Sequence, residues 1–120
     1  MSDAFHRDCP ARMVLDHLTA RWAVLVLTAL RPGPLRFHEL RTKIEGVSEK
    51  MLSQTLRTLT RDGFVGRTVI PATPPQVSYA LTPLGEGVTE PLQALSDWVR
   101  DHADAIVGAQ AAYEDARSDG

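Results

Sequence analysis

A stripe of hydrogen-bond donors begins at residue 50 and continues at intervals of four, three and four residues. At about 100° per residue, these intervals place all of its members on one face of an α-helix. Amide and cationic side chains without a neighbouring acid can pair with phosphate oxygens and with base edges in the major groove of DNA. A plain solvated helix face has the same composition, so the surrounding elements have to decide between the two interpretations. The stripe consists of Lys50, Gln54, Arg57 and Arg61.

The boundaries of this helix are marked by local signals. Ser48 is a good N-cap, and Glu49 suits the positive end of the helix dipole in the first turn. Gly63 is typical of the residue that follows a helix C-terminus. The sequence therefore predicts a helix over about residues 48–62, with the donor stripe on one side. The opposite side would carry a mostly apolar set, Leu52, Thr55, Leu56 and Leu59.

The flanking segments predict a winged helix-turn-helix. A short helix over Phe37–Lys43 leads through a glycine-containing turn, residues 45–47, into the helix with the donor stripe. Two β-rich runs follow, Phe64–Ile70 and Val77–Leu81, and their alternation is typical of half-buried strands. The connection over residues 71–76 is too rich in proline to continue either strand. We expect a mostly α fold with a small β-hairpin wing over about residues 64–81.

Helices are expected on both sides of this unit. Residues Ala11–Leu30 read as helical up to the Pro-Gly-Pro break at 32–34, and Leu35-Arg36 reads as a short third strand. Thr82 and Pro83 open a further helix, over about residues 83–107, which Pro91 is expected to kink. Its heptad-like apolar seam predicts a dimerisation helix, although packing on its own domain would leave the same pattern. The expected interface residues are Leu84, Val88, Leu92, Leu95, Trp98, Val99, His102 and Ile106.

Charge is distributed unevenly along the 120 residues, although the whole chain carries only −2. Residues 31–82 hold eight basic and four acidic side chains, a net +4, whereas residues 83–120 hold two and eight, a net −6. The positive field therefore coincides with the expected winged helix, as binding to phosphate requires. We divide the chain into an N-terminal arm (1–8), the winged helix domain with its flanking helices (9–107) and a polar C-terminal tail (108–120).

The single cysteine, Cys9, directly precedes Pro10. With Pro10 at the first helical position, Cys9 would be the N-cap, where backbone N–H groups and the helix dipole favour a thiolate. A thiolate in a regulator could sense oxidants or electrophiles, whereas an inert capping cysteine is the simpler alternative. A disulfide would need a second subunit or a small thiol.

Several classes of function lack support in the sequence. No apolar run approaches the length of a membrane span, and the first residues do not have the order of a signal peptide, so we expect a cytoplasmic protein without a membrane partner. The four histidines are scattered, which argues against a metal site, and no motif supports a Cys9–His17 nucleophile pair. We therefore expect neither an enzyme nor a bound cofactor.

The ordered motifs from Cys9 to Trp98 resemble the HxlR-type transcriptional regulators, a winged-helix family related to the MarR regulators. The resemblance implies a homodimeric DNA-binding regulator in which the last long helix joins the first in the dimer interface. Some members sense oxidants, quinones or aldehydes through a cysteine that corresponds to Cys9. The matching stretches include Cys9-Pro10, Arg21-Trp22, residues 36–41, residues 46–52, residues 56–59, residues 62–65, residues 74–77, residues 79–82 and Leu84-Gly85.

Two positions depart from the family pattern. Thr19-Ala20 stands where the family commonly has two glycines, so the break between the first two helices is expected to differ. Gln76 stands in the wing where arginine or lysine is frequent, which predicts a weaker phosphate contact and a shallower salt dependence.

These observations together predict a regulator that binds double-stranded DNA as a homodimer on an inverted repeat, with a possible switch at Cys9. Two alternatives stay open: a small-molecule inducer held between the dimer helices near Phe5, Trp22 or Trp98, and a winged helix that binds protein. Gln54 would pair with adenine and Arg57 with guanine, while Arg61 would meet phosphate or pair with Asp62. The expected DNA-binding residues are Arg36, Ser48, Lys50, Ser53, Gln54, Arg57, Arg61, Arg67 and Gln76.

Overall fold

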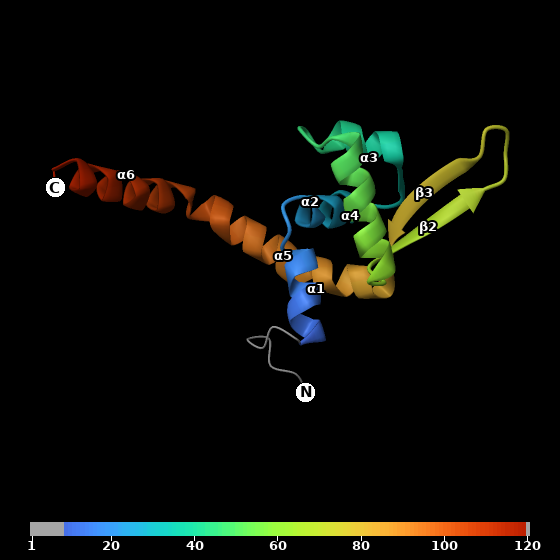
Figure 1. Cartoon of the computed structure of the whole chain (residues 1–120), viewed down its shortest axis with the longest axis horizontal. Coiled ribbons are helices and arrows are strands. Elements are labelled where there is room, and N and C mark those ends of the chain that lie inside the picture. The colour runs from blue at the N-terminus through green and yellow to red at the C-terminus, as the bar shows by residue number, and fades with distance from the viewer. Residues whose placement is uncertain (1–8, 120) are drawn as a thin grey trace.

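The computed structural model describes residues 9–119, which form six helices and three short strands (Figure 1). The N-terminal arm, including Phe5, lies outside the described residues. In chain order the elements are α1 (Pro10–Leu18), α2 (Ala23–Ala29), β1 (Leu35–Arg36), α3 (Phe37–Lys43), α4 (Glu49–Arg61), β2 (Val65–Ile70), β3 (Gln76–Leu81), α5 (Pro83–Asp101) and α6 (Ala103–Asp119).

The helix-turn-helix is formed by α3 and α4, and its local signals are confirmed. The Ser48 hydroxyl accepts a hydrogen bond from the Met51 N–H at 3.1 Å and caps α4. Gly46 in the turn has φ +90° and Gly63 after α4 has φ +86°, both in the left-handed region that favours glycine. Since caps and turn glycines act over a few residues, they fix both ends of α4 without help from the rest of the fold.

The wing belongs to a three-stranded antiparallel sheet with strand order β1-β3-β2. Strand β1 is the predicted third strand, and Leu35 lies opposite Tyr79 of β3. On the other side of β3, Arg67 of β2 lies opposite the same tyrosine. The two longer strands extend away from the helices as a hairpin whose tip projects beside α3 (Figure 1).

The core is built around α2, which packs against α3, α4 and α5. Its residues Val26 and Leu27 have no exposed surface, and neither has Leu40 of α3 nor Leu52 of α4. Thr89 of α5 is the buried polar residue of this core, and its hydroxyl donates to the Gly85 carbonyl. Burial on this scale, at about 1.5–3 kcal/mol for each large apolar side chain, holds the helix-turn-helix in place.

The N-terminal segment Ala11–Leu30, predicted to be helical, is divided into two helices, as the family resemblance implied. Helix α1 ends at Leu18, and the Thr19 hydroxyl and N–H both donate to the Leu15 carbonyl. The chain then turns through residues 19–22 before α2 begins. The threonine satisfies a carbonyl at the helix end, so the break forms without the glycines that are frequent there.

The C-terminal helix differs from the prediction, since the expected helix over 83–107 is divided at His102. Helix α5 continues through Pro91 and ends at Asp101, and His102 N–H donates to the carbonyls of Trp98 and Val99. The residues expected as a polar tail from 108 onward lie in helix α6, where every described residue from Val107 to Ser118 is exposed. The amphipathic pattern that we used to find helices is absent in this segment, which is why its helix was missed.

The molecule is elongated, because the end of α5 and all of α6 project from the body (Figure 1). The radius of gyration is 17.9 Å, against about 14 Å for a compact domain of this length. We call residues 95–119 the arm, a name used from here on for this C-terminal segment and not for residues 1–8.

Candidate nucleic-acid interface

Helix α4 separates its side chains as predicted. Leu52, Leu56 and Leu59 are at most 2% exposed, and together they attach α4 to the core. The four members of the donor stripe, Lys50, Gln54, Arg57 and Arg61, are all exposed. The helix therefore presents a cationic and amide face to solvent, opposite its leucines.

The flank of α4 next to the wing forms a groove of about 500 Å³. Its walls come from two elements that are separate in the sequence, the second half of α4 and the base of the hairpin. Among the described residues that line it, none is acidic. We call this feature the α4–wing groove, and it is lined by Ser53, Leu56, Arg57, Thr60, Arg61, Arg67 and Tyr79.

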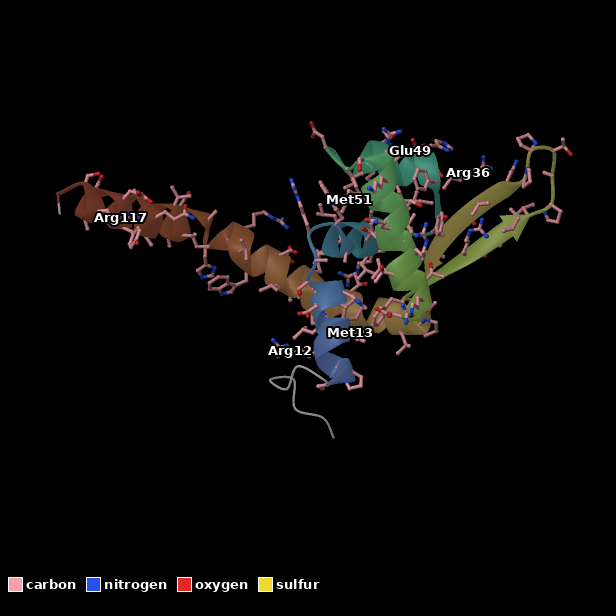
Figure 2. All side chains as sticks on the ribbon, viewed as in Figure 1. Arg12, Met13, Arg36, Glu49, Met51 and Arg117 are labelled. Carbon is pink, nitrogen blue, oxygen red and sulfur yellow. The ribbon has the colours of Figure 1, made fainter. Side chains whose placement is uncertain are left out.

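The other flank of α4 faces α1 and the start of α2 across a smaller cavity of about 230 Å³. Gln54 and Met51 line it together with His17, and Met51 is seen on the side of α4 away from the wing (Figure 2). The structure thus divides the predicted DNA-binding residues of α4 between two flanks. Gln54 adjoins the cavity beside α1, whereas Ser53, Arg57 and Arg61 line the α4–wing groove.

Two predicted backbone-contacting residues are in direct contact with each other. The Arg36 guanidinium donates to the Gln76 side-chain oxygen at 2.8 Å, which ties the start of α3 to the first residue of β3. The Arg36 N–H in turn donates to the Glu39 carboxylate at 2.8 Å, closing the first turn of α3. Arg36 lies between α3 and the wing (Figure 2). Glu49 pairs with Arg41 of α3 at 3.9 Å, and both side chains are exposed.

One alternative for Arg61 was wrong, since Asp62 does not serve as its partner. The Asp62 carboxylate pairs instead with the His17 imidazole of α1, with 2.6 Å between Oδ2 and Nδ1. The Asp62 side chain is only 12% exposed, and this contact fastens the end of α4 to α1. A contact between residues 45 positions apart has no local signal, so sequence spacing could not reveal it.

Cys9 is the N-cap of α1, as predicted, and Pro10 takes the first helical position. The Cys9 carbonyl accepts from the Arg12 N–H at 3.1 Å. The residue is 5% exposed, so within one protomer most of it is shielded from solvent. Arg12 and Met13 follow on the same short helix at the lower edge of the body (Figure 2).

The predicted seam of α5 is split between the core and the surface. Leu92 is 8% exposed and belongs to the protomer's own core, with Val88 packed beside it, so Leu92 does not remain available as an interface residue. Further along, Leu95, Trp98 and Val99 are 46–56% exposed. The Trp98 and His102 rings stack with centroids 4.1 Å apart. Leu84 is 65% exposed near the helix start, and Ile106 in α6 is partly buried.

Two further features were missed in the sequence. Tyr79 and Thr60 line the α4–wing groove, although neither was selected as a site residue. The signal for Tyr79 was available in principle, because antiparallel pairing of the two predicted strands places it opposite Arg67.

Over residues 9–119, no group of three or more His, Cys, Asp or Glu side chains is arranged to hold a metal ion. Over the same range, no helix has the length and apolarity needed to cross a bilayer.

Comparisons with known proteins identify the fold. The HxlR-like helix-turn-helix family model matches residues 17–107. The HTH-type transcriptional regulator YtfH of Escherichia coli K12 is 57% identical over 95 residues, which cover 79% of this chain and 75% of that protein. The solved structure of the transcriptional regulator ytfH from Salmonella typhimurium matches with a TM-score of 0.87 at 47% identity, covering 92% of this chain and 99% of that one.

A second solved structure, the redox regulator HypR in its reduced form, matches with a TM-score of 0.77 at 28% identity. The match covers 83% of this chain and 99% of the HypR chain. These relatives are transcriptional regulators and not enzymes, and they share the mostly helical fold with a small antiparallel sheet.

Proposed function

The chain belongs to the HxlR-like helix-turn-helix family of transcriptional regulators, and we propose that it binds an inverted-repeat DNA operator as a homodimer in the cytoplasm. One observation carries the proposal: α4 exposes a face of cationic and amide donors while its leucines are buried on the opposite side. A helix of this kind, held by a preceding helix and turn, fits the major groove of B-DNA.

We propose a division of roles between residues that read bases and residues that contact the DNA backbone. We assign base reading to Lys50, Ser53, Gln54 and Arg57, since an amide can form two hydrogen bonds with adenine and a guanidinium two with guanine. Arg61, Arg67 and the Arg36–Gln76 pair lie nearer the wing and are assigned to the DNA backbone, where contacts position the protein without selecting sequence. Ser48 is assigned a phosphate contact at the start of α4, next to its capping role.

The arm supports the homodimer. Its large apolar side chains, including Leu95, Trp98 and Val99, have no covering element in the protomer, and Met13 of α1 is also 61% exposed. Pairing of two arms about a two-fold axis would bury these side chains. It would also allow two α4 helices to stand about 34 Å apart, the repeat of the DNA duplex, as an inverted repeat requires.

The experiment is a gel shift and footprint on DNA upstream of the protein's own gene and of its nearest divergent neighbour. A protected inverted repeat is expected, and absence of saturable binding to both fragments would contradict the proposal. On that operator, Gln54→Ala should reduce the preference over scrambled DNA, because a base contact contributes about 1–3 kcal/mol of discrimination. Arg67→Ala should instead weaken binding to operator and scrambled DNA alike.

A matched control separates these roles from general effects on the protein. Arg31→Ala removes an exposed arginine from the turn after α2, outside both the α4–wing groove and the arm. This control should bind like the unmodified protein. The assignment of roles fails if Gln54→Ala and Arg67→Ala give the same ratio of operator to scrambled binding in competition.

We also propose that Cys9 switches DNA binding. Its position at the start of α1 supports this, because α1 contacts the end of α4 through the His17–Asp62 pair. Two Cys9 thiols from two protomers would give two electrons and two protons to a two-electron oxidant such as diamide and form one disulfide between subunits. The fold is shared with the redox regulator HypR.

A Cys9→Ser variant tests the switch. Diamide should release the unmodified protein from its operator, and dithiothreitol should restore binding. The variant should bind DNA in the absence of oxidant and stay bound when diamide is added. Release of the variant by diamide would exclude the thiol as the sensor and favour a small-molecule inducer.

A further inference from the structure

The wing contributes a cation, Arg67, to the α4–wing groove. Arg67 and Tyr79 face each other across β2 and β3, so both side chains project from the same face of the sheet. Val65, two residues before Arg67 on that face, is 2% exposed and belongs to the core. Arg67 itself is exposed, and it lines the groove from the side of the wing.

Two more arginines meet Arg67 in this groove. Arg57 and Arg61 line it from α4, one helical turn apart. Like charges gathered in one groove repel each other, and a neighbouring carboxylate would be the ordinary remedy. Among the described residues, however, the arginines that pair with a carboxylate are Arg41 and Arg100, and not the three arginines of this groove. Asp62, which follows Arg61, is already paired with His17.

The remaining lining is suited to an anion. Ser53, Thr60 and Tyr79 contribute hydroxyl groups, and Leu56 contributes an apolar surface. Guanidinium groups bind phosphate through two parallel hydrogen bonds, and hydroxyls can donate to its remaining oxygens. A volume of about 500 Å³ is within the range of small-molecule binding sites, so the groove can hold a phosphate together with part of the molecule to which the phosphate is attached.

We propose that the α4–wing groove is a binding site for one phosphate group, which Arg61 and Arg67 share and to which Tyr79 donates. The same chemistry is offered by a backbone phosphate of DNA and by a free phosphorylated small molecule. For the DNA phosphate the inference rests on the proposed function, whereas binding of a free phosphate does not require it. Since both ligands use the same groove, a phosphorylated small molecule competes with DNA.

The first experiment uses no DNA. The full chain is titrated with inorganic pyrophosphate at constant ionic strength, and binding is followed by calorimetry. Saturable binding is expected, and it should weaken about tenfold or more in Arg61→Gln and in Arg67→Gln, since each removes a charge-assisted contact. Arg117→Gln, on the distant end of α6 (Figure 2), is the matched control and should bind like the unmodified protein. Absence of saturable binding, or an equal loss in the control, overturns the free-phosphate site.

The second experiment measures the salt dependence of binding to the footprinted DNA. If the two arginines share one phosphate, the double variant should reduce the magnitude of the slope of log K against log[salt] by about 0.9, and neither single variant should exceed that change. The affinity losses of the two single variants should then not add up to the loss in the double variant. Additive losses with a slope change of about 1.8 would indicate two separate phosphates and would overturn the shared site.

Tyr79→Phe isolates the hydroxyl, because the variant keeps the ring that packs beside the core. It should weaken pyrophosphate and DNA several-fold and leave the salt slope unchanged, since no charge is removed. Unchanged affinity would remove Tyr79 from the site.

The two proposals can fail separately. If the protein binds no DNA but pyrophosphate binding depends on Arg61 and Arg67, the proposed function fails and the phosphate site stands. If DNA binds and the double variant leaves its salt slope unchanged, the phosphate site fails for DNA and the proposed function stands. Competition of pyrophosphate with DNA in the unmodified protein, lost in the double variant, would link the two ligands to one groove.

Discussion

The two halves of α5 have the same apolar spacing and different surroundings. In the first half, the seam residue Leu92 is buried and Val88 packs against the core, with Gly85 and Thr89 buried beside them, while Leu84 at the helix start is exposed. In the second half, Leu95, Trp98 and Val99 are about half exposed, although they continue the same seam. A heptad-like pattern therefore predicts which side of a helix is apolar, but it does not tell whether the protomer or a second chain covers that side.

Close approach of the backbones explains the burial of the first half. Thr82 caps α5 by accepting from the Gly85 N–H at 3.1 Å, and its hydroxyl also donates to the Gly63 carbonyl at 2.5 Å. At Gly85 the helix lies so near β2 that an added Cβ would be 2.0 Å from the Phe64 carbonyl oxygen. The C-terminal end of α5 leaves the body (Figure 1).

The largest expected difference in the free energy of unfolding is between variants of Leu92 and variants of Leu95. Leu92→Ala should lower the free energy of unfolding by about 2–5 kcal/mol, because it empties a position in the core. Leu95→Ala removes the same atoms from a side chain that is 56% exposed, so the isolated protomer should lose less than about 0.5 kcal/mol. Denaturant unfolding at several protein concentrations measures both.

Sedimentation equilibrium completes this test. Leu95→Ala should shift the dimer toward protomers, and its stability loss should grow with protein concentration as the dimer contributes more. Equal, concentration-independent losses for the two variants would show that both halves of α5 belong to one core.

A smaller effect is expected at the glycines of the first half. Gly85→Ala should cost about 1–3 kcal/mol, because the new methyl group must displace the backbone at Phe64. Gly87→Ala, two residues later, meets no atom within 4 Å and should instead stabilise the helix by up to about 1 kcal/mol. Thermal unfolding of the two variants gives shifts of opposite sign, and a neutral Gly85→Ala would mean that α5 is not held close to β2.

The smallest effects on stability are expected for variants at the two ends of α5. Thr82→Ala should cost about 1 kcal/mol through the loss of the cap, and Thr82→Ser should restore most of it. Arg100→Ala, which removes an exposed pair with Asp97 at 2.8 Å, should change stability by less than about 0.5 kcal/mol. A larger effect of Arg100 in the dimer than in dilute protomer would place that arginine at the interface.

The sequence predicted the elements whose signals are local. Helices α3 and α4, the cap at Ser48 and the two long strands agree with the prediction within one or two residues, because capping, turn glycines and alternation are properties of short segments. The donor stripe of α4 was also correct, since burial of three leucines determines the orientation of the whole helix.

Two kinds of feature went beyond the sequence patterns. Some are local: the Thr19 hydroxyl bonds to Leu15 at the break over residues 19–22, and the division at His102 interrupts a pattern that looked continuous. The His17–Asp62 pair and the meeting of Arg67 with Arg57 and Arg61 arise only when α1 and the wing are placed beside α4. Patterns along one segment contain no information about such neighbours.

The chain has two tryptophans, Trp22 in the body and Trp98 in the arm, so each of these parts has its own fluorescent reporter. The Trp22 ring is partly buried, with the Arg21 guanidinium 4.6 Å above it and the turn at Gly46 beside it. Trp98 is 54% exposed on the arm. Fluorescence of a Trp98→Phe protein therefore follows the helix-turn-helix alone, and fluorescence of a Trp22→Phe protein follows the arm, so that emission wavelength distinguishes events in the body from pairing of the arms.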